Sequence, residues 1–271
     1  MPAALPLLDR GFLEVANQRL EYSFDGPQPA DAPTLILLHE GLGCAGLWGS
    51  FREMLASATG CGVFAWSRAG YGKSSPVALP RPVTYMHEEA QTVLPELLNA
   101  IGFQHGVLVG HSDGASIAAI YAGTFNDPRL KGISLMAPHF FLEDISLRSI
   151  RQAKIAYETT DLRDKLARWH DHVDVAFRGW NDAWCNPGFC NWDVTGFLPN
   201  IKIPVQIIQG ADDQYGTTRQ LEVAVETCKV PVETVLLEAI KHSPWRETPD
   251  ETCKLISGFC EKVLGSRAGA G

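Results

Sequence analysis

The sequence lacks an apolar run that could cross a membrane, and it lacks clusters of basic residues. No stretch approaches the roughly 20 apolar residues that span a bilayer, so we expect no membrane role. Asp and Glu number 31 against 23 Lys and Arg, and the formal net charge of −8 argues against binding to nucleic acid or anionic lipid. Residues 1–10 show no basic stretch leading into an apolar one. We therefore expect a soluble, unexported protein of the cytoplasm.

The cysteines follow no pairing or metal-binding pattern. Their odd number, 7 in 271 residues, is typical of free thiols in a reducing compartment. Cys185 and Cys190 have no second pair or neighbouring histidine pattern that would complete a zinc site. Gly72-Lys73-Ser74 is not a phosphate loop, because Ser67 occupies the position that requires glycine. We expect no metal and no cofactor, and a small-molecule substrate as the partner.

Short apolar runs separated by helical patterns indicate an α/β fold with a parallel sheet. The runs lack polar alternation, which is typical of strands buried on both faces, and they occupy residues 34–38, 107–109, 133–136 and 205–208. Further strands are expected at 64–66 and 232–237. The segment 12–24 predicts an antiparallel hairpin at the sheet edge. Stripes of apolar residues predict helices at 85–100, with a kink at Pro95, and around 221–228 and 249–263. Thr248, Pro249 and Glu251 predict a capping box at the start of the last helix.

The alternation of strands and helices breaks off after residue 138 and resumes near residue 201, which predicts an insertion at 139–200. The core domain would then comprise 1–138 and 201–264, and 265–271 would be a frayed tail. The insertion begins as charged helical sequence and then becomes rich in tryptophan. We expect a small helical cap whose tryptophans either line an apolar pocket or pack the cap onto the core. Candidate pocket residues are His139, Trp180 and Trp184, together with Glu40.

The strongest chemical signal is Gly110-His111-Ser112-Asp113-Gly114, which lies between a predicted strand and a predicted helix. In that setting G-x-S-x-G is a nucleophile elbow, a strained turn that exposes the serine hydroxyl at the helix N-terminus. Such a serine needs a neighbouring base oriented by a carboxylate. His242 is the best placed of the eight histidines, because it follows the last predicted strand. Asp212 and Asp213 both follow the strand at 205–208, and one of them would orient His242.

With these residues in the order Ser, acid, His, the chain resembles the α/β-hydrolase superfamily over nearly its whole length. The resemblance implies a mostly parallel central sheet with helices on both faces and a helical cap inserted after the sixth strand. It maps the acid onto Asp213 and the base onto His242. It also implies an oxyanion hole made by the N–H of Asp113 and one from residues 39–43, for which we favour Gly41.

The chain departs from many relatives at two positions. Glu40 stands where they have glycine after the loop histidine, and Ser67 replaces an aspartate of the second glycine loop. A carboxylate facing the oxyanion would oppose it, so we expect Glu40 to point behind the loop and hold Gly41 in place.

A serine nucleophile excludes the dehalogenase and epoxide hydrolase subfamilies, which use a carboxylate at the elbow. We therefore expect a serine hydrolase that acts on a small or medium ester, thioester or lactone. Hydrolysis of carbon-carbon bonds in ring-cleavage products is the alternative within the same chemistry. A different class also stays open, namely a cofactor-free lyase or dioxygenase, or a small-molecule receptor on the same fold.

Overall fold

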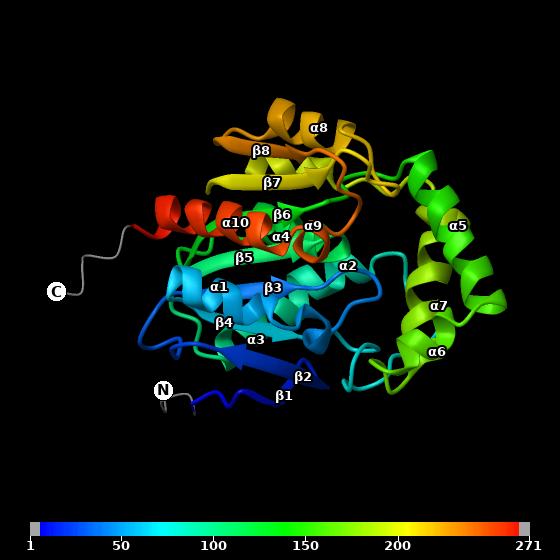
Figure 1. Cartoon of the computed structure of the whole chain (residues 1–271), viewed down its shortest axis with the longest axis horizontal. Helices are drawn as coiled ribbons and strands as arrows, with labels where there is room; N and C mark the ends of the chain where they lie inside the picture. The colour runs from blue at the N-terminus through cyan, green and yellow to red at the C-terminus, as the bar shows by residue number, and fades with distance from the viewer. Residues whose placement is uncertain (1–5, 266–271) are drawn as a thin grey trace.

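A computed structural model describes residues 6–265 of the 271 and is built around one eight-stranded sheet (Figure 1). The strand order is β1-β2-β4-β3-β5-β6-β7-β8. β1 and β2 pair antiparallel at one edge, and β3 to β8 run parallel. The strands are β1 (Arg10–Val15), β2 (Gln18–Asp25), β3 (Thr34–Leu38), β4 (Gly62–Trp66), β5 (Gly106–His111), β6 (Leu130–Met136), β7 (Val205–Gly210) and β8 (Val232–Leu237). The predicted parallel sheet and the edge hairpin are confirmed.

Helices cover both faces of the sheet, because alternate residues of the central strands point to opposite sides. In β3, Leu35 and Leu37 pack in the cluster that contains helices α1 and α10, whereas Ile36 and Leu38 pack in the cluster that contains α3 and α4. The helices of the core are α1 (Phe51–Thr59), α2 (Tyr85–Glu88), α3 (Leu94–Ala100), α4 (Asp113–Thr124), α8 (Arg219–Thr227), α9 (Pro244–Glu247) and α10 (Pro249–Leu264). No helix within residues 6–265 has the length and apolarity needed to cross a membrane.

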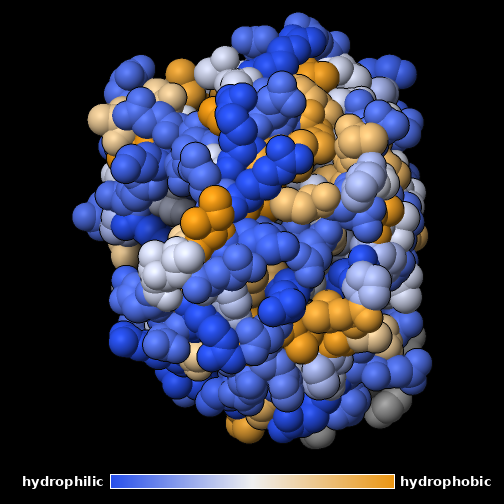
Figure 2. Space-filling view, turned by 90° about the vertical axis from the view of Figure 1, so that its right-hand side faces the viewer, coloured by the Kyte–Doolittle hydropathy of each residue, from blue (hydrophilic) through white to orange (hydrophobic). Residues whose placement is uncertain are grey.

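The chain between β6 and β7 forms a helical insertion beyond the carboxyl ends of the parallel strands (Figure 1). It contains α5 (Asp144–Thr159), α6 (Leu162–Ala167) and α7 (Val173–Trp184), followed by two short 3₁₀ helices. Figure 2 looks at this face, where hydrophilic residues predominate and apolar residues form separate patches. The domain boundaries at 139 and 200 stay a prediction, and most of the expected tail lies outside the described residues.

Two local expectations differ from the structure. The helix expected at 85–100 is interrupted by a π-helical turn, Glu89–Val93, and Pro95 lies in the first turn of the following helix. A proline there removes no intrahelical hydrogen bond, so the irregularity lies in the turn before Pro95 rather than at Pro95 itself. The capping box at α10 is wrong as well. The hydroxyl of Thr248 donates to the Glu251 carboxylate at 3.4 Å and forms no side-chain cap.

Candidate active site

Ser112 occupies a sharp turn between β5 and α4. Its backbone has φ 53° and ψ −119°, a conformation that side chains other than glycine rarely adopt. The flanking glycines are required by close backbone approach. A Cβ on Gly110 would lie 2.5 Å from Cα of Ala115, and one on Gly114 would lie 2.1 Å from the Leu38 carbonyl oxygen. The motif therefore folds as an elbow that presents the Ser112 hydroxyl at the start of α4.

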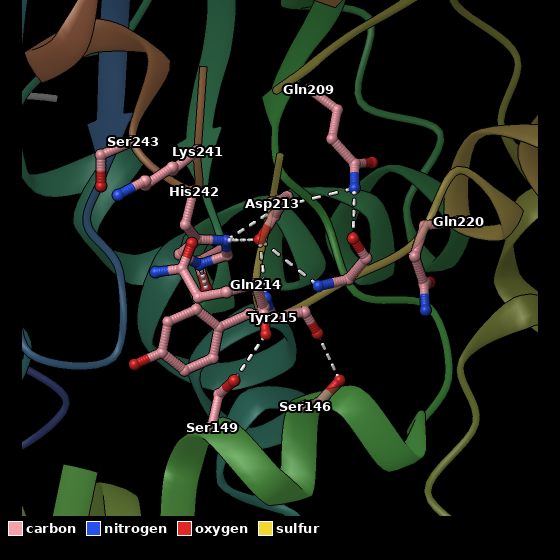
Figure 3. A network of polar contacts seen from close by, with 12 residues as sticks. Ser146, Ser149, Gln209, Asp213, Gln214, Tyr215, Gln220, Lys241, His242 and Ser243 are labelled. Carbon is pink, nitrogen blue, oxygen red and sulfur yellow. Dashed lines mark hydrogen bonds and ion pairs between the residues drawn. The ribbon is translucent and has the colours of Figure 1, made fainter. Parts of the chain in front are cut away.

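The structure brings Ser112, His242 and Asp213 together from three separate segments of the chain. Nε2 of His242 lies 3.0 Å from Oγ of Ser112. Nδ1 of His242 lies 2.9 Å from each Asp213 oxygen (Figure 3). Asp213 also accepts a hydrogen bond from the backbone N–H of Tyr215 at 2.8 Å. Burial raises the pKa of Asp213, but His242 and this N–H lower it by more, so the net pKa is below the usual value. Asp212 is exposed, and the carboxylate that bonds to His242 is that of Asp213.

The loop carrying Asp213 is held by both the core and the insertion. Gln209, at the end of β7, donates to the carbonyl of Gly216 at 2.9 Å. From α5, Ser146 donates to the carbonyl of Tyr215 and Ser149 to that of Gln214, each at 2.5 Å (Figure 3). The insertion is thus tied directly to the segment that orients His242.

The loop carrying His242 is held by His111, the residue before the nucleophile. Nε2 of His111 donates to the carbonyl of His242 at 2.7 Å, and Nδ1 accepts from the indole N–H of Trp245 at 3.1 Å. Sequence reasoning placed His111 only in the elbow motif. Its partners lie more than a hundred residues away, and no local pattern reveals that pairing.

Arg68 connects the two proposed halves of the oxyanion hole. Its guanidinium donates to the carbonyls of His39 and Glu40, at 2.5 Å and 3.0 Å, and lies 3.9 Å from the carboxylate of Asp113. Asp113 is fully buried and accepts a hydrogen bond from Tyr85, and burial raises its pKa. The backbone N–H groups of Gly41 and Asp113 have no acceptor within the described residues. Arg68 thus holds the segment that leads directly into Gly41.

A cavity of about 170 Å³ lies over Ser112, between the core and the insertion. All the candidate pocket residues line it, namely Glu40, His139, Trp180 and Trp184, together with Gly41 and Asp113. A Cβ on Gly41 would lie 2.1 Å from Nε1 of Trp180, so only glycine fits beneath that ring. The other tryptophans of the insertion do not line the cavity: Trp192 packs on Trp184 and Phe189, and Trp169 is exposed. The indole N–H of Trp184 also donates to the hydroxyl of Tyr85 in the core at 2.9 Å, so both expected roles of these tryptophans occur.

Glu40 is one of the residues that line the cavity, and its carboxylate lies 3.5 Å from Nδ1 of the buried His111. A Cβ on Gly43 would lie 2.4 Å from Oε2 of Glu40, so the side chain also lies against its own loop. The expectation that Glu40 points behind the loop and holds Gly41 in place stays a prediction. Arg68 holds the same loop through the carbonyl of Glu40. Burial raises the pKa of Glu40, but the polar groups around it, including its own backbone N–H, lower it by more, to about 2. Glu40 is therefore ionised at neutral pH.

His170 of the insertion bridges two loops of the core. Its Nδ1 accepts from the N–H of Gly72 at 2.9 Å, and its Nε2 donates to the carbonyl of Leu42 at 3.0 Å. Sequence reasoning missed this contact, because a histidine between two helices has no local signal for it. Within residues 6–265, no group of three or more His, Cys, Asp or Glu side chains is placed to hold a metal ion.

Comparison with known proteins places this geometry in a family. The family model described as alpha/beta hydrolase family matches residues 35–255. A bifunctional esterase/perhydrolase of Acinetobacter calcoaceticus is 25% identical over 217 residues, which cover 69% of this chain and 76% of that protein. A bacterial membrane phospholipase A superposes with a TM-score of 0.77 at 20% identity, over 95% of this chain and 87% of the other. For the enol-lactonase of Burkholderia xenovorans the TM-score is 0.73 at 19% identity, over 92% and 99% of the two chains. The chain belongs to the alpha/beta hydrolase family.

Proposed function

We propose that the protein is a serine hydrolase that cleaves a small carboxylic ester or lactone through an acyl-enzyme on Ser112. The observation that carries this proposal is the hydrogen-bonded series Ser112, His242, Asp213 at the wall of a cavity. The separation of 3.0 Å between Ser112 and His242 allows direct proton transfer. The names of the relatives, an esterase/perhydrolase and an enol-lactonase, agree with ester-like substrates.

In the first half of the reaction, Oγ of Ser112 attacks the substrate carbonyl and His242 takes the hydroxyl proton. The negative charge that develops on the carbonyl oxygen is stabilised by the N–H groups of Asp113 and Gly41. His242 then gives the proton to the departing alcohol, and the acyl group stays on Ser112. In the second half, water attacks the acyl carbon, His242 takes the water proton and returns it to Ser112, and the acid is released.

Asp213 supports both halves of the reaction by staying ionised. Because its pKa is lowered, it carries negative charge when His242 becomes an imidazolium, and it stabilises that cation at 2.9 Å. Its contact with Nδ1 also fixes the tautomer that leaves Nε2 free to accept the serine proton.

The experiment is covalent labelling by a fluorophosphonate, followed by an ester panel graded by acyl length. We expect labelling of the native protein and of the control variant Ser257→Ala, whose hydroxyl lies on α10 away from the cavity, and no labelling of Ser112→Ala. Ester turnover should fall by several orders of magnitude in Ser112→Ala without loss of folding.

Two results would redirect the proposal. A native protein that never labels would contradict a nucleophilic serine and favour a cofactor-free lyase, a dioxygenase or a receptor. Labelling at Ser112 with no turnover of any ester, thioester or lactone would instead favour the carbon-carbon bond hydrolase.

A further inference from the structure

His139 is a buried imidazole on the wall of the cavity whose hydrogen bonding is incomplete. It follows β6, is 2% exposed, and its Nδ1 is buried without a hydrogen-bond partner. Its ring lies beside His242 and Trp184, with centroid distances of 5.6 Å and 5.3 Å. A polar atom left unpaired in a buried site is unfavourable, so its position beside the reacting groups calls for an explanation.

Other buried histidines around the site have a partner for each ring nitrogen. His39 pairs with the Glu40 carbonyl and the Arg68 N–H. His111 pairs with His242 and Trp245, and His170 with Leu42 and Gly72. These rings hold loops together, whereas the ring of His139 forms no hydrogen bond with the described residues.

The backbone of His139 is fixed even though its ring is unpaired. Ser116 of α4 donates to the His139 carbonyl at 2.6 Å, and the next N–H, that of Phe140, donates to the side chain of Gln220 at 2.7 Å. Trp184 packs against the imidazole edge to face, at an interplanar angle of 73°. A polar group held rigidly in this way is prepared to bind a ligand without reordering.

The ring of His139 is neutral throughout the ordinary pH range. Burial lowers its pKa, and the neighbouring His242 lowers it further, to about 3. One ring nitrogen therefore donates and the other accepts, and neither attracts an anion. Glu40, ionised on the same cavity wall, repels anions as well.

We propose that His139 binds a hydroxyl group of the substrate, so that the preferred substrates are small, uncharged hydroxy esters. This inference rests on the proposed ester hydrolysis and names its substrate class. A hydroxyl both donates and accepts, so in either tautomer of the neutral ring it can pair with Nε2, the ring nitrogen that has no hydrogen-bond partner among the described residues and, unlike Nδ1, keeps accessible surface. The carbon atoms of the substrate would pack on Ile150, Trp180 and Trp184, which line the same cavity. The volume of about 170 Å³ is close to the ~150 Å³ of a cavity that holds benzene, so the part of the substrate inside the cavity is small.

The test compares methyl butyrate with methyl 2-hydroxybutyrate and methyl 3-hydroxybutyrate in the native protein and in two variants. Asn and Leu have similar shapes, so His139→Asn keeps a hydrogen-bonding group and His139→Leu removes it. We expect at least one hydroxy ester to exceed the butyrate in kcat/KM by about tenfold or more. His139→Leu should abolish that preference, and His139→Asn should retain part of it.

The matched control is His87→Phe. His87 is also partly buried with an unpaired Nδ1, but it packs on Phe197 outside the cavity. The variant His87→Phe should leave the preference for hydroxy esters over methyl butyrate unchanged. Equal kcat/KM for butyrate and both hydroxy esters in the native protein, or an unchanged preference in His139→Leu, would overturn the inference.

A binding measurement separates this inference from the proposed reaction. By calorimetry, the native protein should bind 2-hydroxybutyramide or 3-hydroxybutyramide about tenfold more tightly than butyramide, and His139→Leu should not. Binding of this kind without turnover of any ester would support the His139 site and contradict ester hydrolysis. Ester turnover with no hydroxyl-dependent binding or rate would contradict the His139 site alone.

Discussion

Replacing Arg68 by methionine tests whether one buried side chain positions the oxyanion loop. The guanidinium is 1% exposed, and within residues 6–265 it is the only group that donates to the carbonyl of His39. The carbonyl of Glu40 keeps two other donors, the N–H of Gly43 at 3.1 Å and Nδ1 of His39 at 2.7 Å. The substitution therefore leaves one buried carbonyl unpaired, which costs about 1–3 kcal/mol.

The same substitution removes the cation beside the buried carboxylate of Asp113. Breaking a buried pair costs up to about 3–5 kcal/mol, but this contact is long, at 3.9 Å, and Asp113 keeps its hydrogen bond from Tyr85. Burial already raises the pKa of Asp113, so the carboxyl can take up a proton and reduce the penalty. We expect Arg68→Met to lower the free energy of unfolding by about 2–5 kcal/mol in total.

Activity should fall together with stability, because the carbonyls that Arg68 holds belong to the residues directly before Gly41. A displaced oxyanion donor lowers kcat by about 10²-fold. The matched control is Arg52→Met. Arg52 is also buried, pairs with Asp25 at 2.6 Å and donates to the Ala45 carbonyl. Arg52→Met should therefore lower the free energy of unfolding without a comparable loss of kcat in the folded protein.

The assays are urea denaturation and ester kinetics on the native protein, Arg68→Met, Asp113→Asn and the double variant. Asp113→Asn removes the charge but keeps the backbone N–H. The double variant should therefore lose less unfolding free energy than the two single variants lose together, by at least about 1 kcal/mol. Additive effects would refute the role of the charge. An unchanged kcat in folded Arg68→Met would refute the positioning of Gly41.

Three further predictions concern the carboxylates and the buried imidazole. Asp213→Asn should lower kcat by about 10⁴-fold in steady-state assays, because the tautomer of His242 is no longer fixed, whereas Asp212→Asn, on an exposed side chain, should have little effect. Glu40→Gln should lower kcat/KM equally for monomethyl succinate and methyl butyrate, because the carboxylate lies against His111 and Gly43. Like charges 6 Å apart repel by roughly 3 kcal/mol at an effective dielectric of about 20, so a rise of about tenfold in the succinate to butyrate ratio would contradict this placement and indicate a carboxylate that faces the substrate. The pKa of His139 is about 3 in the fold against 6.5 ordinarily, so the unfolded chain binds the extra proton and stability is lost as the pH falls from 6.5 towards 3. As the pH falls through this window, the free energy of unfolding of the native protein should decrease by about 1.4 kcal/mol per pH unit more than that of His139→Asn. Parallel plots of unfolding free energy against pH for the two proteins would contradict a neutral buried ring.

The elbow could be predicted from the sequence because every interaction that defines it is local. The elbow consists of strand β5, the two glycines around Ser112 and the start of helix α4, which follow one another directly in the chain. The glycines are required by backbone contacts as close as 2.1 Å. The strands were predictable for a similar reason, since runs such as β3 are apolar on both faces. Choosing His242 needed one more step, the rule that functional loops follow the carboxyl ends of parallel strands.

The neighbours of Glu40 could not be predicted in this way. The sequence correctly marks the position as unusual, but the direction of a side chain on a loop depends on what occupies the space on each side of it. Arg68, 28 residues away, holds the Glu40 carbonyl, and His111 lies beside the carboxylate. Neither neighbour can be read from the residues around position 40.

The sequence by itself determined the order of strands and helices, the strained serine turn and the set of residues from which a triad is built, because periodicity, glycine and helix signals act over short stretches of chain. Only the tertiary structure decided which groups pair across the sheet ends. Arg68 with Asp113, His111 with His242, and His170 with Leu42 are separated by 45, 131 and 128 residues. It likewise decided that the ring of His139 remains without a partner, because an unpaired atom is recognised only when every neighbour in space is known.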